Sequence, residues 1–328
     1  MAGGGDYSSL QQPSGGYAAA GDDGMASYAG SQNPPSPYAA GGPVASTITA
    51  GLGNGVNLQP SYYYDGDVDL GWNLMAKYPR IKSVRIEIEM GREAVAERWI
   101  REAVSRKYAV IATFHSAAIL TSDQLLMDDP NELFKAAAWW VTNYSSLSKA
   151  GEFTINLMNE WGSHAITPHD YAATYNQAIA TVRSVYDGPI IVDLPGFGQE
   201  AHTAALAVVG KSGQTLKDPK IILSAHVYPQ AFSLSRNRAM TTADLDELAA
   251  TGRGCMLGEF GDDGSGGKTP WADLVKYAKS MDWPVFGWAW NGDGGRMNMI
   301  QPVPFQKVSS TAYPYTVGPY FQPIYDLL

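Results

Sequence analysis

Cysteine is almost absent from this sequence, and its scarcity limits the possible fold classes. The 328 residues contain a single cysteine, Cys255. A disulfide framework and a cysteine-based metal cluster are therefore excluded. Cys255 lies in an apolar run, where we expect a buried and unreactive side chain. No set of Asp, Glu and His residues has metal-ligand spacing along the sequence either, so we expect neither a metal ion nor another cofactor.

Positive charge and long apolar stretches are scarce as well. Lys and Arg number 23 against 32 Asp and Glu, and the net charge is −9. An acidic surface disfavours binding to nucleic acid or to anionic membranes. No apolar run approaches the about 18 residues that a membrane-spanning helix needs. We therefore expect neither nucleic acid nor membrane among the partners of this protein.

The first 46 residues contain little that could form a core. Ala, Gly, Ser and Pro supply 31 of these 46, and no helical or strand period is visible. Such a segment cannot bury enough apolar surface to offset its chain entropy, so we expect residues 1–46 to be a disordered leader. They also lack Lys and Arg, so neither a secretory signal peptide nor a transit peptide is expected there. The folded part is expected to span residues 47–328.

Eight short apolar runs recur along the rest of the sequence. They are rich in β-branched and aliphatic residues with little alternation, which is typical of strands buried on both faces. Segments with helical periodicity lie between several of them, at 93–106, 131–148 and 169–186. Eight alternating β and α units predict a closed (β/α)8 barrel, a TIM barrel in the α/β class. An open doubly wound sheet is disfavoured because no Gly-rich phosphate loop follows the first run. The expected strands are Gly55–Gln59, Ser83–Glu89, Tyr108–Phe114, Phe153–Met158, Pro189–Leu194, Lys220–His226, Gly254–Gly258 and Pro284–Trp290.

Two of these runs lead into a glutamate with distinctive neighbours. The fourth leads into Asn159-Glu160-Trp161-Gly162, and the seventh leads into Glu259-Phe260-Gly261. In a barrel, the carboxyl ends of all strands lie on the face that carries the active site, and strands four and seven are nearly opposite each other. Two carboxylates that flank a bond are the machinery of glycoside hydrolysis. The sequence therefore predicts a sugar-cleaving enzyme with Glu160 and Glu259 as its catalytic pair.

With their flanking residues, these two segments resemble the acid/base and nucleophile motifs of glycoside hydrolase family 5. Any one motif of this kind occurs by chance, but six in the same order and at strand ends are specific. The resemblance spans from about residue 53 to residue 290, which is nearly the whole expected barrel. The four further matching segments are Ser83–Ile86, Ala112–His115, Ser224–Tyr228 and Phe286–Trp290.

The resemblance implies roles for the residues around the two glutamates. Glu160 would be the general acid/base and Glu259 the nucleophile. Asn159 would hydrogen-bond the 2-hydroxyl of the sugar in the −1 subsite. Arg85 and Tyr228 would hold Glu259 in its ionised form, because a nucleophilic carboxylate needs a nearby positive charge or hydrogen-bond donors. The acid, in contrast, needs a raised pKa to keep its proton near neutral pH.

The resemblance also implies roles for three side chains further around the barrel. His115 and His226 would line the floor of the site and tune protonation, and Trp288 would be the platform for the −1 sugar. A purely structural role remains an alternative for the two histidines and for Arg85. The two histidines could be hydrogen-bonded core residues, and Arg85 could merely pair with Glu87 or Glu89 of its own strand.

The substrate is less clearly indicated. The segment Ile191–Gln199 resembles bacterial endo-β-1,4-mannanases of the family more than its cellulases, although Ser116 and Asp262 stand where the mannanase pattern has Asp and His. The resemblance implies a retaining, endo-acting hydrolase of β-1,4-mannan, with an endo-β-1,4-glucanase as the alternative. A catalytically silent glycan-binding or elicitor module is a third possibility. We expect a β-linked polysaccharide as the partner, a monomer, and an extracellular location without a visible signal peptide.

Overall fold

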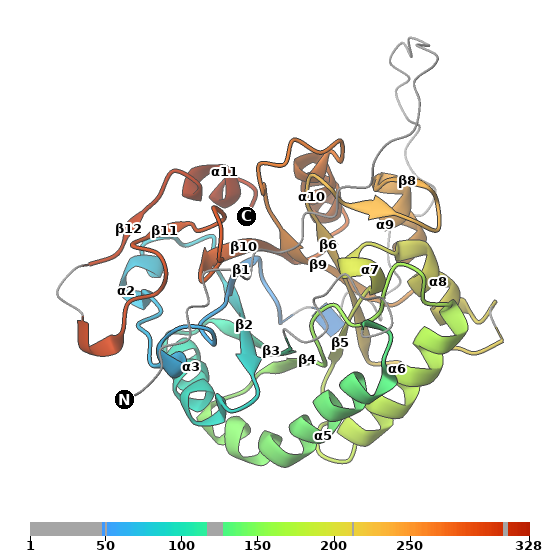
Figure 1. Cartoon of the computed structure of the whole chain (residues 1–328), viewed down its shortest axis with the longest axis horizontal. Coiled ribbons are helices and arrows are strands. Elements are labelled where there is room, and N and C mark those ends of the chain that lie inside the picture. Colours follow the sequence, from blue (N-terminus) through green and yellow to red (C-terminus); the bar gives the residue numbers. More distant parts are fainter. Residues whose placement is uncertain (1–47, 50, 117–126, 212, 311–313) are drawn as a thin grey trace, which may run out of the picture.

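The protein folds as a closed barrel of eight parallel strands with helices around it (Figure 1). The computed structural model describes residues 48–49, 51–116, 127–211, 213–310 and 314–328. The barrel order is β1-β2-β3-β4-β5-β6-β9-β10, and β10 pairs with β1 to close it. The prediction of a (β/α)8 barrel is confirmed, whereas the predicted leader, residues 1–46, lies outside the described residues. The barrel strands are β1 (Gly55–Leu58), β2 (Ser83–Glu89), β3 (Ala109–His115), β4 (Thr154–Asn156), β5 (Ile190–Asp193), β6 (Ile221–Val227), β9 (Gly254–Phe260) and β10 (Val285–Asn291).

Helices connect most of the strands and form the outer layer. The start of α5 illustrates why these segments are helical: Asp129 accepts a hydrogen bond from the main-chain nitrogen of Asn131 (2.9 Å), and Pro130 takes the first helical position. Both residues are favoured at a helix N-terminus. The helices are α2 (Trp72–Met75), α3 (Glu93–Ser105), α5 (Pro130–Leu147), α6 (Pro168–Val182), α7 (Pro195–Gly198), α8 (Ala201–Val209), α9 (Thr242–Ala249), α10 (Trp271–Ser280) and α11 (Phe321–Tyr325), with short 3-10 turns at Tyr64–Gly66, Ser148–Ala150 and Val308–Ser310.

The buried apolar side chains form two main layers. The larger layer lies between the strands and the helices and includes Val110 and Ala112 of β3. The smaller layer contains Ile111 of β3, and successive strand side chains point to opposite faces, so this layer fills the barrel interior. Ile48 and Leu52 pack against it, which closes the end of the barrel where the strands begin. The other residues of the inner layer are Ile191, Ile222, Met256 and Phe286.

Short additional strands extend the opposite face, where the barrel strands end. The hairpin of β7 (Phe232–Ser233) and β8 (Arg238–Ala239) follows β6. A second antiparallel pair, β11 (Ile300–Gln301) and β12 (Thr316–Val317), follows β10. Among the described residues, no helix is long and apolar enough to cross a membrane.

Candidate active site

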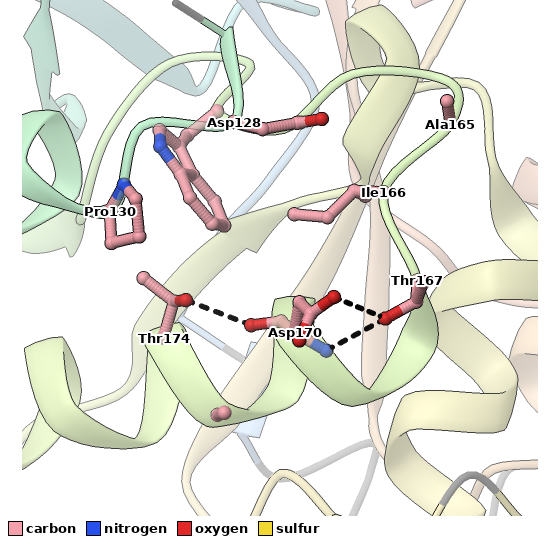
Figure 2. Close-up of a pocket in the computed structure, with 9 residues that line it drawn as sticks. Asp128, Pro130, Ala165, Ile166, Thr167, Asp170 and Thr174 are labelled. Atoms are coloured by element: carbon pink, nitrogen blue, oxygen red, sulfur yellow. Dashed lines mark hydrogen bonds between the residues drawn. The ribbon is translucent and has the colours of Figure 1, made fainter. Parts of the chain in front are cut away.

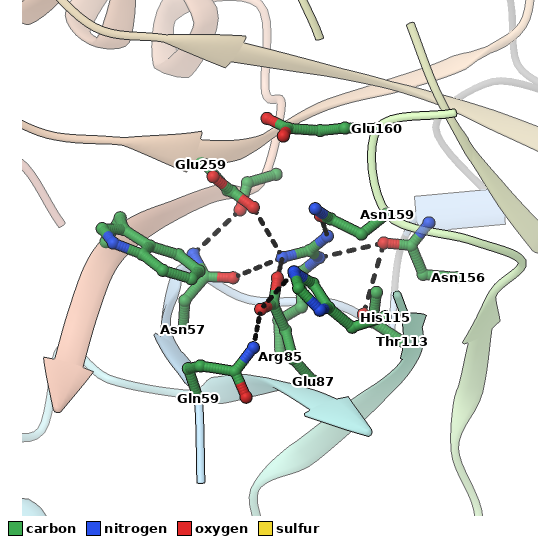
Figure 3. Close-up of polar contacts among 12 residues, drawn as sticks. Asn57, Gln59, Arg85, Glu87, Thr113, His115, Asn156, Asn159, Glu160 and Glu259 are labelled. Carbon is green, nitrogen blue, oxygen red and sulfur yellow. Dashed lines mark hydrogen bonds and ion pairs between the residues drawn. The ribbon is translucent and has the colours of Figure 1, made fainter. Parts of the chain in front are cut away.

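Polar side chains collect where the barrel strands end, above the apolar inner layer (Figure 3). Nearly all of them are buried, so they replace water with contacts to one another. The fold brings all eight residues predicted for the site into this region. They are Arg85 on β2, His115 at the end of β3, Asn159 and Glu160 after β4, His226 on β6, Tyr228 just after it, Glu259 on β9 and Trp288 on β10.

The guanidinium group of Arg85 is the centre of the site. It is fully buried, and its Nη1 donates to one carboxylate oxygen each of Glu87 and Glu259, both at 2.9 Å. Its Nη2 donates to Asn159 at 2.6 Å and lies 3.3 Å from Asp193. Burial disfavours the cation, but the surrounding carboxylates outweigh it and raise the pKa of Arg85. Arg85 therefore pairs with Glu87, as the structural alternative supposed, and also holds Glu259.

The carboxylate of Glu259 is arranged to stay ionised. Its Oε1 accepts from Arg85, and its Oε2 accepts from the hydroxyl of Tyr228 at 2.6 Å. Burial alone would raise the pKa of Glu259, but His226, Arg85 and the Tyr228 hydroxyl together lower it below its ordinary value. Two donors on a carboxylate in a water-poor site favour the charged form. Glu259 is thus suited to act as a nucleophile.

Glu160 has the opposite environment. Its Oε1 accepts from Nδ1 of His226 at 2.7 Å, and its main chain has φ of 49°. Burial raises the pKa of Glu160, and the negative charge of Glu259 adds to this against the effect of His226. Glu160 therefore favours its protonated form, as a general acid requires.

The two glutamates are close together. One oxygen of Glu160, one oxygen of Glu259 and a ring nitrogen of His226 all lie within 4.8 Å of one another. The carboxyl groups of retaining glycosidases are about 5–5.5 Å apart, whereas those of inverting enzymes are about 6.5–9.5 Å apart to leave room for water. The observed spacing fits direct attack by one carboxylate.

Both histidines are buried among carboxylates. Burial alone would lower their pKa values, but the pKa of His226 is raised to about 9 by Glu259, Asp193 and Glu160. The pKa of His115 is also raised to about 9, through Glu87 and through Glu89, which lies 2.8 Å from its Nδ1. His226 contacts Glu160 directly, whereas His115 contacts the acidic residues behind Arg85.

Asn159 and Trp288 are fixed by hydrogen bonds to neighbouring side chains. The side-chain oxygen of Asn159 accepts from Arg85, so its amide nitrogen is the group that remains to donate to a ligand. The indole nitrogen of Trp288 donates to Asp293 at 3.0 Å, and its ring packs beside Tyr228. Trp290, two residues further on, is fully buried and donates to the carbonyl oxygen of Leu70. Of these two tryptophans, only Trp288 keeps an exposed part, 8% of its surface.

Several site residues were not identified from the sequence. Asn57 at β1 and Asn156 at β4 each accept from Arg85 at 2.9 Å, and Glu87 accepts from both Arg85 and Gln59. Asp193 at the end of β5 contacts Arg85, Asn156 and the main chain of Glu160. A signal for Asp193 was present, because a charged residue at the carboxyl end of a barrel strand indicates the catalytic face.

Sequence spacing indicated no metal-ligand cluster, but within the described residues the fold assembles one group with suitable distances. It consists of Glu160, His226 and Glu259. Both oxygens of Glu259 already accept from Arg85 and Tyr228, and Nδ1 of His226 faces Glu160 at 2.7 Å. The guanidinium group supplies the positive charge that a metal ion would bring to this carboxylate.

A separate pocket of about 320 Å³ lies beside Trp161, between the start of α5 and the start of α6 (Figure 2). Its polar groups are largely used in the cap of α6: the hydroxyl of Thr167 accepts from the main-chain nitrogen of Asp170 and donates to its carboxylate at 2.7 Å. None of the residues predicted for the site lines this pocket. It is therefore distinct from the cluster around Arg85.

Comparison with known proteins agrees with this geometry. Residues 86–294, more than half of the chain, match the family model described as Cellulase (glycosyl hydrolase family 5). A mannan endo-1,4-beta-mannosidase from Streptomyces lividans is 25% identical over 182 residues, which are 54% of this chain and 45% of that protein. This chain thus spans less than half of the length of that relative.

Solved structures with the same fold include both mannanases and glucanases. A beta-mannanase from Thermomonospora fusca superposes with a TM-score of 0.60 at 18% identity, over 84% of this chain and 88% of that one. The catalytic domain of an endoglucanase from Thermobifida fusca superposes with a TM-score of 0.63 at 14% identity, over 84% and 90%. At these identities the likeness shows the fold alone, whereas the family is shown by the match of residues 86–294. This chain belongs to glycosyl hydrolase family 5.

Proposed function

We propose that this protein is an endo-acting β-1,4-mannanase that works by double displacement with retention of anomeric configuration. The observation that carries the mechanism is the pair of buried glutamates with opposite environments. Glu160 accepts from one histidine and has a raised pKa, whereas Glu259 accepts from Arg85 and Tyr228 and has a lowered pKa. One oxygen of each lies within 4.8 Å of the other, which is closer to the spacing of about 5–5.5 Å in retaining enzymes than to that of about 6.5–9.5 Å in inverting ones.

The first displacement breaks the glycosidic bond. Glu259 attacks the anomeric carbon while Glu160 gives its proton to the departing sugar oxygen. A covalent glycosyl ester on Glu259 results, and the transition state has oxocarbenium character. Asn159, whose side-chain oxygen accepts from Arg85, donates through its amide nitrogen to the 2-hydroxyl of the sugar in this proposal. A hydrogen bond at this position strengthens as charge develops on the ring.

The second displacement releases the product. Glu160, now ionised, takes a proton from water, and the resulting hydroxide oxygen attacks the anomeric carbon of the ester. Glu259 leaves as a carboxylate and Glu160 is protonated again, so the site returns to its starting state. His226 remains hydrogen-bonded to Glu160 through Nδ1 and supports both of its protonation states.

Mannan is proposed as the substrate because two observations favour it. The segment Ile191–Gln199 carries the mannanase-like pattern, and the curated relative at 25% identity is a mannosidase. An endo-β-1,4-glucanase is the second candidate, since Ser116 and Asp262 depart from the mannanase pattern and an endoglucanase shares the fold. A silent binding module is disfavoured, because both glutamates and their hydrogen-bond partners are in place. We further propose that the enzyme acts outside the cell as a monomer.

A reducing-sugar assay on mannan, glucomannan, carboxymethylcellulose and xylan in parallel tests the proposed activity. Mannan and glucomannan should be cleaved fastest. A faster reaction on carboxymethylcellulose would show that the enzyme is an endoglucanase and not a mannanase.

Glu259→Ala should abolish turnover of every substrate. Glu160→Ala should keep a measurable glycosylation step on dinitrophenyl glycosides, whose leaving group needs no proton. Wild-type activity of Glu160→Ala on polymer would contradict its role as the acid.

A further inference from the structure

Asp193 connects the two halves of the site, although no role in the reaction sketched above requires it. It ends β5 and is fully buried. Its Oδ2 accepts from the main-chain nitrogen of Glu160 at 3.1 Å and from Nη2 of Arg85 at 3.3 Å. Its Oδ1 accepts from the side-chain amide of Asn156 at 3.2 Å. One carboxylate thus contacts the segment that carries the acid and the cation that holds the nucleophile.

The main chain of Glu160 needs such an anchor. Its φ of 49° lies in the left-handed region, which a residue with a side chain adopts only where the surrounding structure holds it there. The main-chain hydrogen bonds from the β4 segment to β5 stop after Leu157, which donates to Ile191 at 3.1 Å. The N–H of Glu160 then donates to the side chain of Asp193. This bond fixes the direction in which the Glu160 side chain leaves the backbone.

Asp193 also faces the histidine that contacts Glu160. Nδ1 of His226 is 2.7 Å from Glu160, and Nε2 on the other side of the ring is 3.6 Å from Oδ2 of Asp193. Nε2 is buried and has no hydrogen-bond partner within the described part of the protein. At 3.6 Å the contact is electrostatic, and in a buried site such an attraction is little screened. The imidazolium of His226 therefore lies between Asp193 on one side and Glu160 and Glu259 on the other.

We propose that Asp193 is a positioning residue for the acid/base Glu160, which it holds through the main chain and through the orientation of His226. The inference rests on the proposed double-displacement function, in which Glu160 protonates the leaving group. It predicts that loss of the Asp193 charge slows the steps that need proton transfer by Glu160 and leaves the rates of the other steps nearly unchanged.

The same contact predicts a change in pH dependence. Removing the negative charge of Asp193 should lower the pKa of Glu160, because Asp193 is one of the groups that raise it. His226 should keep its positive charge at neutral pH in the variant, since Glu259 and Glu160 also raise its pKa. The basic limit of kcat/KM should then move to lower pH. The other charged or titratable groups that face Glu160 are Arg85, Glu87, His115, His226, Tyr228 and Glu259.

The test compares Asp193→Asn with a matched control. Asp244→Asn removes another fully buried carboxylate, one that caps α9 and pairs with Arg238 away from the site. For Asp193→Asn, kcat/KM on polymer should fall roughly 10- to 100-fold, a large part of the effect of general acid catalysis. The first-turnover burst on a dinitrophenyl glycoside should fall less than about 3-fold, since that step needs no acid. Asp244→Asn should leave the ratio of the two rates and the pH profile unchanged.

A substrate-free measurement separates failure of this inference from failure of the proposed function. Nitrogen-15 NMR should show His226 losing its imidazolium proton at lower pH in Asp193→Asn than in the wild type, whether or not mannan is the substrate. If Asp193→Asn does not fold, Asp193→Glu keeps the charge but displaces it. This variant should lower the polymer rate and leave the basic pH limit in place. Equal losses on polymer and activated substrate, or an unchanged His226 titration, would overturn the inference.

Discussion

At the residue scale, the site is a buried and nearly balanced set of charges. When Glu160 carries its proton and Glu87 is ionised, three carboxylates face three cations. In the proposed first displacement, Glu160 gains a negative charge while Glu259 loses one by forming the ester. The buried net charge is therefore unchanged, which avoids the large cost of an unpaired buried ion. The three carboxylates are Glu87, Asp193 and Glu259, and the three cations are Arg85, His115 and His226.

Tyr228→Phe tests how Glu259 is kept ionised. The variant removes the 2.6 Å hydrogen bond to Oε2, which helps to lower the pKa of Glu259. A hydrogen bond to a charged group contributes about 1.5–3 kcal/mol, so kcat/KM should fall roughly 10- to 100-fold. The pKa of Glu259 should rise, and the acidic limit of the kcat/KM profile should move to higher pH. Tyr186→Phe, whose lost hydroxyl donates to Phe153 outside the site, is the control. An unchanged acidic limit in Tyr228→Phe would contradict the argument.

The sequence predicted some of these residues and missed others for a physical reason. Glu160 and Glu259 were predictable because each follows an apolar run at a defined strand of a barrel. The positive φ of Glu160 could not be predicted, since it depends on an acceptor from another strand, Asp193. Contacts between strands distant in sequence, such as Arg85 with Asn57, likewise follow from the register and not from local pattern.

At the element scale, strand patterns were predicted closely and strand ends less well. β9 continues to Phe260, two residues past the predicted end, because Glu259 and Phe260 still pair with β6. β4 is shorter than predicted and ends at Asn156, so the chain is free to turn before Glu160. The helix predicted at 169–186 ends at Val182. The β7–β8 hairpin was not predicted, because its strands of two residues are too short to show periodicity.

The cap of α9 provides a prediction at this scale. The hydroxyl of Thr241 accepts from the main chain at Asp244, whose carboxylate accepts from the main chain of Thr241. Thr241→Ala should reduce the free energy of unfolding by about 1 kcal/mol, as is usual for loss of an N-cap. It should leave kcat/KM unchanged, because α9 contributes no residue to the site. Chemical denaturation measures the loss, with Thr142→Ala on the exposed side of α5 as a neutral control. An equal loss of unfolding free energy in both variants would contradict a stabilising role of Thr241 as the N-cap of α9.

At the scale of the whole molecule, the apolar side chains that stabilise the barrel and the polar side chains of the site lie at opposite ends of its interior. Apolar side chains fill its interior near the strand beginnings, and the polar cluster occupies the interior where the strands end. The site is thus supported from below by a packed core and from the sides by eight strands. Ile48 and Leu52 complete the lower core, so the folded unit needs the chain at least from this point onward.

Truncation before Thr47 tests the division between residues 1–46 and the barrel. The removed segment has little apolar surface to dock, and it contributes no residue of the predicted site. We expect the melting temperature and kcat/KM of residues 47–328 to equal those of the full chain within error. A variant truncated further, before Gly53, should melt earlier because it lacks Ile48 and Leu52. Loss of activity on polymer in the shorter truncation would show that the segment contributes to the site.

The central claim of the account is that Glu259 forms a covalent bond to the sugar while Glu160 protonates the leaving group. Proton NMR of the first-formed product of mannan or mannooligosaccharide hydrolysis tests it most directly, because the anomeric signal is read before mutarotation. Two displacements at one carbon predict that the β-anomer appears first and that the α-anomer grows in slowly afterwards. First appearance of the α-anomer would mean a single displacement by water and would contradict the role of Glu259 as nucleophile.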